Sequence, residues 1–138
     1  SILRETIYPA DISDRTKKKA TDLALKIAEK INLYGILAVE MFVMKNDDIL
    51  INELAPRPHN SGHWTLDFCE TSQFQNLIHT IINGSPKTPK PSGSCKMINV
   101  IGNDFLKKDD FKEKYKFYDY LKEEIKPFRK MGHYTFRN

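Results

Sequence analysis

The sequence is poor in cysteine and glycine and has no long apolar run. Its two cysteines, Cys69 and Cys95, stand far apart with no Cys-x-x-Cys spacing, and its six glycines form no glycine-rich phosphate loop. This pattern disfavours zinc and redox motifs and predicts free thiols in a reducing compartment, by default the cytoplasm. No stretch approaches the roughly 20 apolar residues of a membrane span, so no membrane contact is predicted.

The N-terminal residues "SILRETIYPADISD" lack the basic start and apolar run of a signal peptide. They also lack an initiator methionine, so we expect the 138 residues to be a piece of a longer protein. Apolar residues make up 40% and charged residues 29%, which is the balance of a globular protein and not of a disordered one. The length fits one ordinary domain or two small ones.

The net charge of +4 arises mainly from lysines at 17–19 and between Lys107 and Lys130. Two interpretations are open, a solvated surface or a partner rich in phosphate. Aromatic residues alternate with lysines in "FKEKYKFYDYLKEEIKPFRK", as in some nucleic-acid-binding proteins, but acidic residues interrupt the segment throughout. A continuous basic stripe is therefore not expected, and nucleic acid is disfavoured as a partner.

Periodicity and capping signals predict an α+β fold with a mostly antiparallel sheet, helices on one side and a small β-rich C-terminal unit. The Pro-, Gly- and Ser-rich segment 84–94, "GSPKTPKPSGS", is the predicted linker between domains at 1–83 and 95–138. The expected elements are a strand within 1–12 ending at Pro9, a helix capped by Ser13 or Asp14 and running to about Asn32, strands at 36–44 and 49–55, a helix from Ser72 to Asn83 with capping-box spacing to Gln75, a strand at 95–102, a short helix in the lysine-rich segment and a final strand in "GHYTF".

Two strand-like runs, "ILAVEMFVM" and "ILINELA", each place one carboxylate among aliphatic residues, Glu40 in the first and Glu53 in the second. A hairpin turning through residues 46–47, or through 45–48, pairs residue 43 with 50 and residue 40 with 53. Directly opposed side chains have Cβ atoms about 4.5–5.5 Å apart. Two carboxylates at that separation repel each other, and an apolar setting worsens the repulsion by desolvating both.

Such a pair is tolerated if the carboxylates share a proton, if they pair with a cation such as Arg57, or if they bind a divalent metal. Mg²⁺ favours carboxylate oxygens and often bridges them to substrate phosphates. Asn52 is adjacent to Glu53, although in an ideal strand it points to the other face. In a further interpretation one glutamate simply faces solvent on an edge strand, and a register slip of one residue separates the two carboxylates entirely.

The loop "PRPHNSGHW" that follows Glu53 is dense in polar groups. Prolines stiffen it, Gly62 permits close approach, and Arg57 with backbone amides and hydroxyls makes a suitable anion cradle. Zinc is disfavoured for His59 and His63, because no cysteine or third histidine accompanies them. A thiol nucleophile at Cys69 is also disfavoured, because nothing in the sequence orients it.

The segments "VEMFV", "INELAPRPHNSGHWT", "SQF", "MINVIG" and "KPFRKMGH", in this order, resemble the 5-(carboxyamino)imidazole ribonucleotide synthases, ATP-grasp ligases of purine biosynthesis. The resemblance covers nearly the whole chain but only the C-terminal part of those enzymes. It implies the C-terminal half of an ATP-grasp domain, an antiparallel sheet with flanking helices, followed by a small and incomplete β-rich domain. The family's glycine-rich loop and adenine-binding strand lie upstream, so this piece alone is expected to be inactive.

The resemblance also implies the chemistry. ATP phosphorylates bicarbonate to carboxyphosphate, and 5-aminoimidazole ribonucleotide takes the carboxyl group to give N-carboxyaminoimidazole ribonucleotide, ADP and phosphate. ATP and Mg²⁺ are the implied cofactors, and a cytoplasmic homodimer is the implied form of the intact enzyme.

Two alternative functions stay open. One is another ATP-grasp ligase such as the formate-dependent glycinamide ribonucleotide transformylase, which is similar at "PRPH" but less so at "HNSGHW". The other is a non-catalytic module that binds phosphate or nucleic acid.

By the same resemblance, carboxylates hold Mg²⁺ and the nucleotide, a polar loop lines the phosphoryl-transfer region, and basic side chains grip the ribonucleotide phosphate. Departures from the family pattern lie near the basic residues, where Leu121 and Phe128 replace glycines and Lys126 replaces an arginine. The expected site residues are Glu40 and Glu53 for the metal, Asn52 and Glu53 for the nucleotide, Arg57, His59, Asn60 and Ser61 for catalysis, and Lys122 and Arg129, with Lys130 in reserve, for the ribonucleotide.

Overall fold

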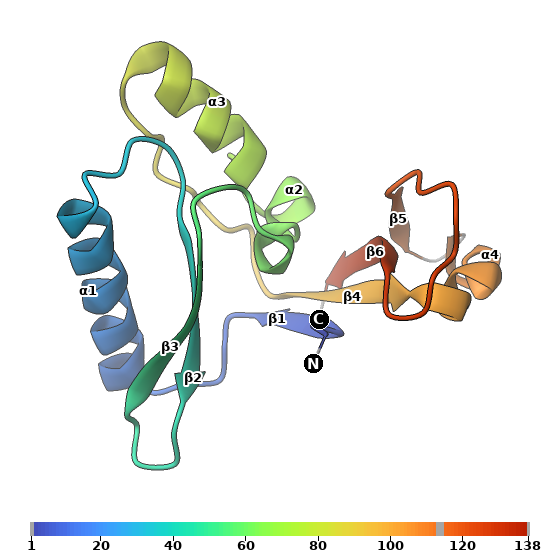
Figure 1. Ribbon diagram of the computed structural model, residues 1–138, viewed down its shortest axis with the longest axis horizontal. Coiled ribbons are helices and arrows are strands. Elements are labelled where there is room, and N and C mark those ends of the chain that lie inside the picture. Colours follow the sequence, from blue (N-terminus) through green and yellow to red (C-terminus); the bar gives the residue numbers. More distant parts are fainter. Residues whose placement is uncertain (1, 113–114, 138) are drawn as a thin grey trace. The chain divides into compact units, whose positions relative to one another are not determined.

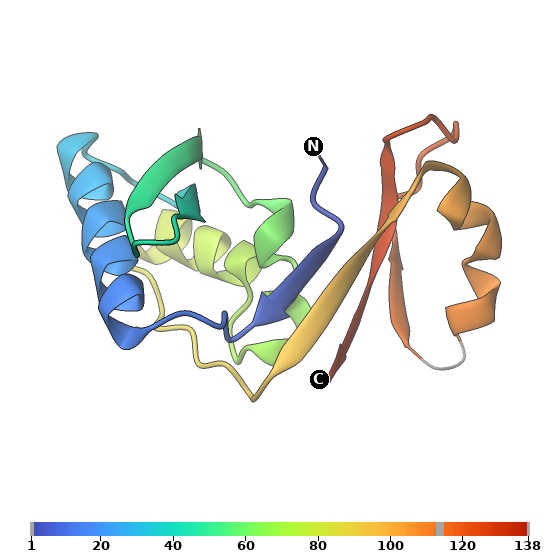
Figure 2. The ribbon, with the colours of Figure 1, turned by 90° about the horizontal axis from the view of Figure 1, so that it is seen from below.

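The computed structural model describes residues 2–112 and 115–137, and its contacts divide the chain into two compact units. Ala10–Lys90 form one, here called the helix–hairpin unit. Residues up to Pro9 join those from Pro91 onward in the other, here called the sheet unit. Figures 1 and 2 show both units. The first strand, β1, belongs to the sheet unit because it pairs with β4, so the contact units do not follow chain order as the predicted segments do.

The helix–hairpin unit begins with α1 (Asp14–Lys30), which contacts both strands of a hairpin formed by β2 (Ala38–Val43) and β3 (Ile49–Ala55) (Figure 1). Ser13 is the N-cap, and its hydroxyl accepts a hydrogen bond from the Thr16 backbone N–H at 3.1 Å. A serine cap satisfies a backbone donor that the first helical turn leaves unpaired. The predicted helix, its cap and its role as a cover for strands are confirmed.

The tip of the hairpin differs from the prediction by one residue. Met44 N–H donates to Asp48 O at 2.8 Å, and Asp47, with φ of 62°, completes a turn of three residues, 45–47. Such a turn is a common hairpin connection whose last residue adopts the left-handed conformation. As a result Val43 faces Ile49, and the predicted pairing of residue 43 with residue 50 is wrong.

A β-bulge between Glu40 and Met41 corrects this offset further along the hairpin. Met41 pairs with Ile51 and Glu40 pairs with Glu53, so Asn52 is an extra residue in β3. A bulge of this kind places two residues of one strand opposite a single residue of the other. The predicted pairing of the two glutamates is therefore confirmed, although the route to it through a regular ladder was wrong.

After β3 the chain makes the 3-10 turn η1 (Asn60–Gly62), the short helix α2 (Thr65–Phe68) and α3 (Gln73–Asn83). The capping box at the start of α3 is confirmed: Ser72 Oγ accepts from Gln75 N–H at 3.2 Å, and Gln75 Oε1 accepts from Ser72 N–H at 2.9 Å. Gly84, with φ of 73°, closes the helix as predicted. The short helix α2 has no counterpart among the predicted elements.

The sheet unit contains an antiparallel sheet with strand order β1-β4-β6-β5. Met97 and Met131 are fully buried in this unit, together with Asn99 and His133, which face each other across β4 and β6. A Cβ atom on Gly132 would lie 2.5 Å from the Tyr118 carbonyl oxygen, so close approach of β5 to β6 requires glycine there. The elements of this unit are β1 (Glu5–Tyr8), β4 (Cys95–Ile101), η2 (Gly102–Lys107), α4 (Asp109–Lys112), β5 (Lys116–Asp119) and β6 (Lys130–Arg137).

The α+β class and the β-rich C-terminal region are confirmed, but β5 was not among the predicted strands. Lysines and an aspartate surround its aromatic residues, and the strand is too short to show a clear alternation of apolar and polar residues. Among the described residues, no helix combines the length and the apolar character required to cross a membrane.

Candidate functional site

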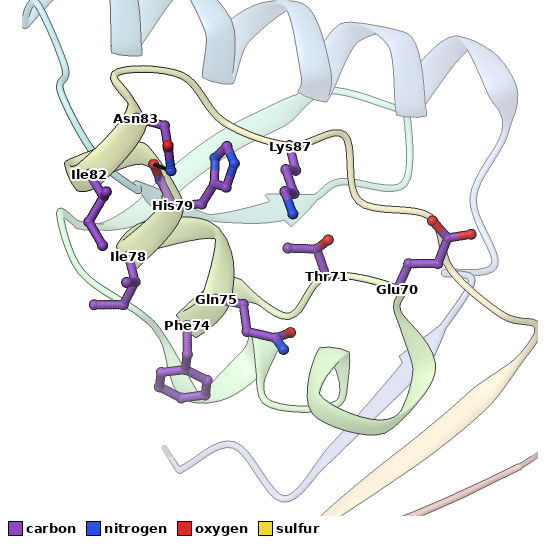
Figure 3. A pocket seen from close by; sticks show the side chains of 9 residues that line it. All are labelled: Glu70, Thr71, Phe74, Gln75, Ile78, His79, Ile82, Asn83 and Lys87. Carbon is purple, nitrogen blue, oxygen red and sulfur yellow. Dashed lines mark hydrogen bonds between the residues drawn. The ribbon is translucent and has the colours of Figure 1, made fainter.

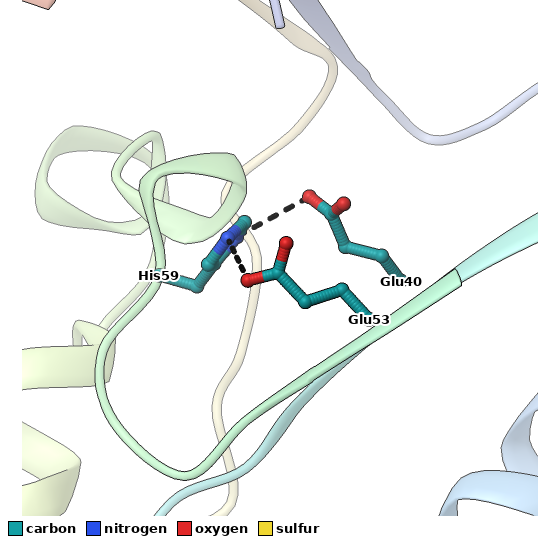
Figure 4. A group of neighbouring side chains, drawn as sticks. All are labelled: Glu40, Glu53 and His59. Carbon is teal, nitrogen blue, oxygen red and sulfur yellow. Dashed lines mark ion pairs between the residues drawn. The ribbon is translucent and has the colours of Figure 1, made fainter. Parts of the chain in front are cut away.

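Two carboxylates and an imidazole converge beside the bulge of the hairpin (Figure 4). Glu40 extends from β2 and Glu53 from β3, and His59 follows in the loop after β3. His59 Nδ1 lies 3.5 Å from Glu40 Oε1, and His59 Nε2 lies 3.8 Å from Glu53 Oε1. One ligand atom from each of the three side chains lies within 4.8 Å of the others. The sequence predicted that the two carboxylates lie together, and the structure shows that His59 lies beside them.

The bulge also brings Asn52 to this group. Its Nδ2 donates a hydrogen bond to Glu40 Oε2 at 3.1 Å across the hairpin. In a regular strand Asn52 would point away from its neighbour Glu53, and that expectation was wrong because a bulge turns two successive side chains toward one face. The amide therefore orients one carboxylate, and this orientation depends on an irregularity that the sequence pattern did not reveal.

His59 is 8% exposed and is held by its own loop. Its Nδ1 lies 2.8 Å from Ser61 Oγ, and the Ser61 backbone N–H donates toward the same nitrogen at 3.4 Å. An accepting Nδ1 favours the tautomer that carries its hydrogen on Nε2, the nitrogen facing Glu53. Asn60 and Ser61 form the 3-10 turn directly after His59. Of the predicted loop residues, Ser61 thus has a defined task, which is to orient the imidazole.

Arg57 lies at the edge of the group. Its Nη2 is 4.0 Å from Glu53 Oε1, its Nη1 donates to the Pro58 carbonyl at 3.1 Å, and 61% of its side chain is exposed. An exposed pair at this distance contributes little. Charge pairing with Arg57 therefore does not account for two adjacent glutamates, and a shared proton, a solvent-facing glutamate and a divalent cation are the interpretations that stay open.

The donor set fits such a cation. Ligands about 2.1 Å from an ion and on opposite sides of it are roughly 4.2 Å apart, so atoms within 4.8 Å of one another need only small side-chain movements to bind one. Paired carboxylates suit Mg²⁺, and the imidazole lies beside them with its Nδ1 held by Ser61. Glu40 is partly buried and Glu53 is half exposed, which leaves room for substrate oxygens and water.

The predicted phosphate-binding residues lie in the sheet unit. Lys122 and Arg129 line a hollow of about 370 Å³ together with Leu121, Glu123 and Glu124. Arg129 Nη1 donates to the Glu124 carbonyl at 3.3 Å. Lys130 does not line this hollow; it begins β6 and pairs with Ile101. The structure thus brings Lys122 and Arg129 together, as predicted, while the nearby glutamates make the local charge mixed.

Two residues of this loop adopt a backbone conformation that favours glycine. Leu121 has φ of 52° and Phe128 has φ of 64°. These are the positions where the resemblance implies glycine, so the left-handed backbone is present without the residue that adopts it freely. Side chains in this conformation cost roughly 1–2 kcal/mol. Both are largely exposed, at 84% and 80%, so packing offsets little of that cost.

We therefore predict that Leu121→Gly raises the free energy of unfolding. The relief of about 1–2 kcal/mol of strain exceeds the roughly 0.4–1 kcal/mol that glycine costs through its freer unfolded state, so a gain of about 0.5–1 kcal/mol is expected. Chemical denaturation measures it. Leu106→Gly is the matched control, since Leu106 is 71% exposed in the 3-10 helix η2 and glycine should destabilise there. Equal losses in both variants would contradict the strain.

The Cys69 thiol and a hollow along α3 are not part of this site. Burial raises the pKa of the Cys69 thiol, which lowers its thiolate fraction and counts against a nucleophile. A hollow of about 540 Å³ runs along α3 (Figure 3) and contains none of the predicted residues. Its Glu70 pairs with Lys90 at 3.3 Å, and its His79 Nδ1 lies 2.9 Å from the Ser85 carbonyl, so these groups already have protein partners.

Comparison with known proteins identifies the family. The sequence model of the ATP-grasp domain family matches residues 1–74, more than half of the chain. The chain belongs to the ATP-grasp family. The sequence model of the phosphoribosylaminoimidazole carboxylase C-terminal domain family matches residues 95–138 of the same chain. Both matches agree with the order of segments on which the sequence resemblance was based.

Individual relatives agree with the family models. The ATP-grasp chain is 46% identical over 142 residues to the N5-carboxyaminoimidazole ribonucleotide synthase of Bacillus subtilis, with 99% of the chain aligned. Its fold matches the Staphylococcus aureus N5-carboxyaminoimidazole synthetase with a TM-score of 0.88 at 36% identity, covering 97% of this chain and 37% of that one. It also matches the Aspergillus clavatus synthase in complex with ADP and 5-aminoimidazole ribonucleotide, with a TM-score of 0.86 at 32% identity, covering 100% of this chain and 39% of that one. The chain spans about 37% of the length of the Bacillus relative.

Proposed function

We propose that this chain supplies the cation-binding and phosphate-binding parts of a ligase that carboxylates 5-aminoimidazole ribonucleotide with ATP and bicarbonate. The observation that carries the proposal is the direct opposition of Glu40 and Glu53 with His59 against both. The similarity to synthases over nearly the whole chain supports it. In this reaction bicarbonate oxygen attacks the γ-phosphorus of ATP, which releases ADP and gives carboxyphosphate. The substrate amine then attacks the carboxyl carbon, a C–N bond forms and phosphate leaves.

The residues of the cluster hold and orient groups and need not form covalent bonds, because phosphoryl transfer mainly requires positioning and charge neutralisation. Glu40 and Glu53 would hold Mg²⁺, which when bound neutralises charge on the nucleotide phosphates. Asn52 fixes the orientation of Glu40 through its 3.1 Å hydrogen bond. The loop after β3 would line the region beside the carboxylates with Arg57, His59, Asn60 and Ser61. Within it, His59 and the Arg57 guanidinium face the Glu53 carboxylate.

Lys122 and Arg129 would bind the phosphate of the ribonucleotide in their shared hollow. Arginine suits this task because its planar fork donates two parallel hydrogen bonds to a phosphate. Lys126 pairs with Glu124 at 2.8 Å, which offsets one of the two carboxylates that line the hollow. Lys130, at the start of β6, remains a reserve candidate.

The test is the reaction itself. Protein expressed from the complete coding sequence is expected to release ADP and phosphate only when ATP, Mg²⁺, bicarbonate and 5-aminoimidazole ribonucleotide are all present. The carboxylated amine is identified with ¹³C-bicarbonate. Turnover with formate and glycinamide ribonucleotide instead would favour the transformylase alternative. Absence of both activities together with salt-dependent binding of mixed-sequence nucleic acid would favour the non-catalytic module.

The setting and assembly of the enzyme are part of the same proposal. Neither Cys69 nor Cys95 forms a disulfide, which supports a reducing compartment and thus the cytoplasm. A homodimer follows from the family resemblance, and the molar mass of the protein in solution tests it.

A further inference from the structure

Gln73, the first residue of α3, reaches back into the loop that carries His59. Its Oε1 accepts the His59 backbone N–H at 2.9 Å, and its Nε2 donates to the His59 carbonyl at 2.9 Å. The same Nε2 lies 2.7 Å from His63 Nδ1. One carboxamide therefore binds both backbone polar groups of His59 and one ring nitrogen of His63.

These contacts leave one orientation for the carboxamide. The His59 N–H can only donate and the His59 carbonyl can only accept, so the oxygen of Gln73 faces the first and its NH₂ group faces the second. The NH₂ group then donates to His63 Nδ1, which must be an acceptor and so carries no hydrogen. Gln73 thereby determines the tautomer of His63 as well as the backbone orientation of His59.

The rest of the loop is built around this side chain. Gln73 N–H donates to Thr65 Oγ1 at 3.0 Å, and Thr65 Oγ1 donates to the Gly62 carbonyl at 2.6 Å. A Cβ atom on Gly62 would lie 2.9 Å from Gln73 Oε1 and 3.3 Å from Nε2. Gly62 thus leaves the space that the carboxamide occupies, and the contacted atoms are the movable end of a flexible side chain.

We propose that Gln73 is the positioning residue of the cation site: its carboxamide holds the His59 backbone so that the buried imidazole faces Glu40 and Glu53. The inference rests on the proposed function, because it assigns Gln73 to the same site. His59 is 8% exposed and 3.5 Å and 3.8 Å from the two carboxylates, so a rotation of its backbone moves the imidazole away from both. Groups that orient the residues around a metal typically affect affinity or activity by about 10–100-fold.

The experiment compares Gln73→Leu with Gln75→Ala in protein expressed from the complete coding sequence. Gln75 lies in the same helix turn and its side chain caps α3 through Ser72, so its loss tests helix stability without the loop contact. Gln73→Leu is expected to lower kcat for ATP turnover and the affinity for Mn²⁺ alone by about 10–100-fold each. Its KM for the ribonucleotide should stay within about threefold of the parent, whereas Gln75→Ala should resemble the parent in all three quantities.

A spectroscopic measurement separates positioning from general stability. ¹⁵N shifts of the histidine side chains are expected to show His63 in the tautomer with hydrogen on Nε2 in the parent and in Gln75→Ala. In Gln73→Leu, His63 should show a mixture. If Gln73→Leu does not fold, Gly62→Ala replaces it, since the added methyl group displaces the carboxamide while the backbone stays compatible with alanine.

Several outcomes would overturn the inference. Equal kcat and Mn²⁺ affinity in Gln73→Leu and Gln75→Ala would do so, as would an unchanged His63 tautomer. Glu53→Gln, assayed in parallel, keeps this failure apart from that of the proposed function. If Glu53→Gln retains turnover, the proposed function fails; if it loses turnover while Gln73→Leu keeps it, only the role of Gln73 fails. In the double variant Gly62→Ala/Gln73→Leu the two losses should not add, because both act through one carboxamide.

Discussion

Replacing Glu53 by glutamine is expected to lower ATP turnover by about 100-fold or more, the range seen when one preorganised partner of a developing charge is removed. The substitution keeps the shape of the side chain and removes a single negative charge. Because Glu40 faces Glu53 directly, the remaining carboxylate would have to hold the cation with the help of a neutral amide. The expected loss is therefore partly recovered at high Mg²⁺ concentration, which steady-state kinetics at varied Mg²⁺ would measure.

The stability of the same variant gives an independent check, because its expected change has the opposite sign. Like charges directly opposed in a hairpin destabilise it. Without Mg²⁺, Glu53→Gln should therefore unfold at slightly higher denaturant concentration than the parent, while its turnover is lost. Glu29→Gln, an exposed position in α1, is the control and should change neither quantity. Unaltered turnover in Glu53→Gln would remove the assigned role of this carboxylate.

Arg129→Ala is expected to raise the KM for 5-aminoimidazole ribonucleotide by about 10–100-fold, since charge-assisted hydrogen bonds contribute roughly 1.5–3 kcal/mol. The KM for ATP should change little, because the residues proposed to bind the cation belong to the helix–hairpin unit. Initial rates with each substrate varied in turn measure both constants.

The control for Arg129→Ala is Lys107→Ala, which removes one positive charge from the same unit without touching the residues that line the hollow. Lys107 is exposed at the end of the 3-10 helix η2. A larger KM for ATP in Arg129→Ala, with an ordinary KM for the ribonucleotide, would contradict the assignment. Equal effects in both variants would point to general electrostatics instead of a phosphate contact.

The parts of the fold that follow from local chemistry could be predicted from the sequence. The caps of α1 and α3 depend on side chains within three residues of the backbone groups they bind, and both were found as expected. The pairing of Glu40 with Glu53 was also predicted, but from a regular ladder that the hairpin does not have. The turn of three residues shifts the ladder by one, and the bulge at Asn52 shifts it back. The pattern of alternating residues contains neither irregularity.

The parts that depend on contacts between distant residues were not predicted. Gln73 binds His59, fourteen positions earlier, through an amide that looks like any other polar residue at the start of a helix. The strand β5 depends on pairing with β6, because its own sequence has too little alternation to indicate a strand. The backbone at Leu121 and Phe128 keeps the left-handed conformation without glycine, and this too is fixed by the surrounding loop.

The bulge at Asn52 separates the hairpin into two segments with independent alignment. Pairs on the turn side of it follow the length of the turn, whereas Glu40 and Glu53 lie beyond it. The two acidic side chains are therefore aligned by the bulge, and the pairs near the tip by the turn.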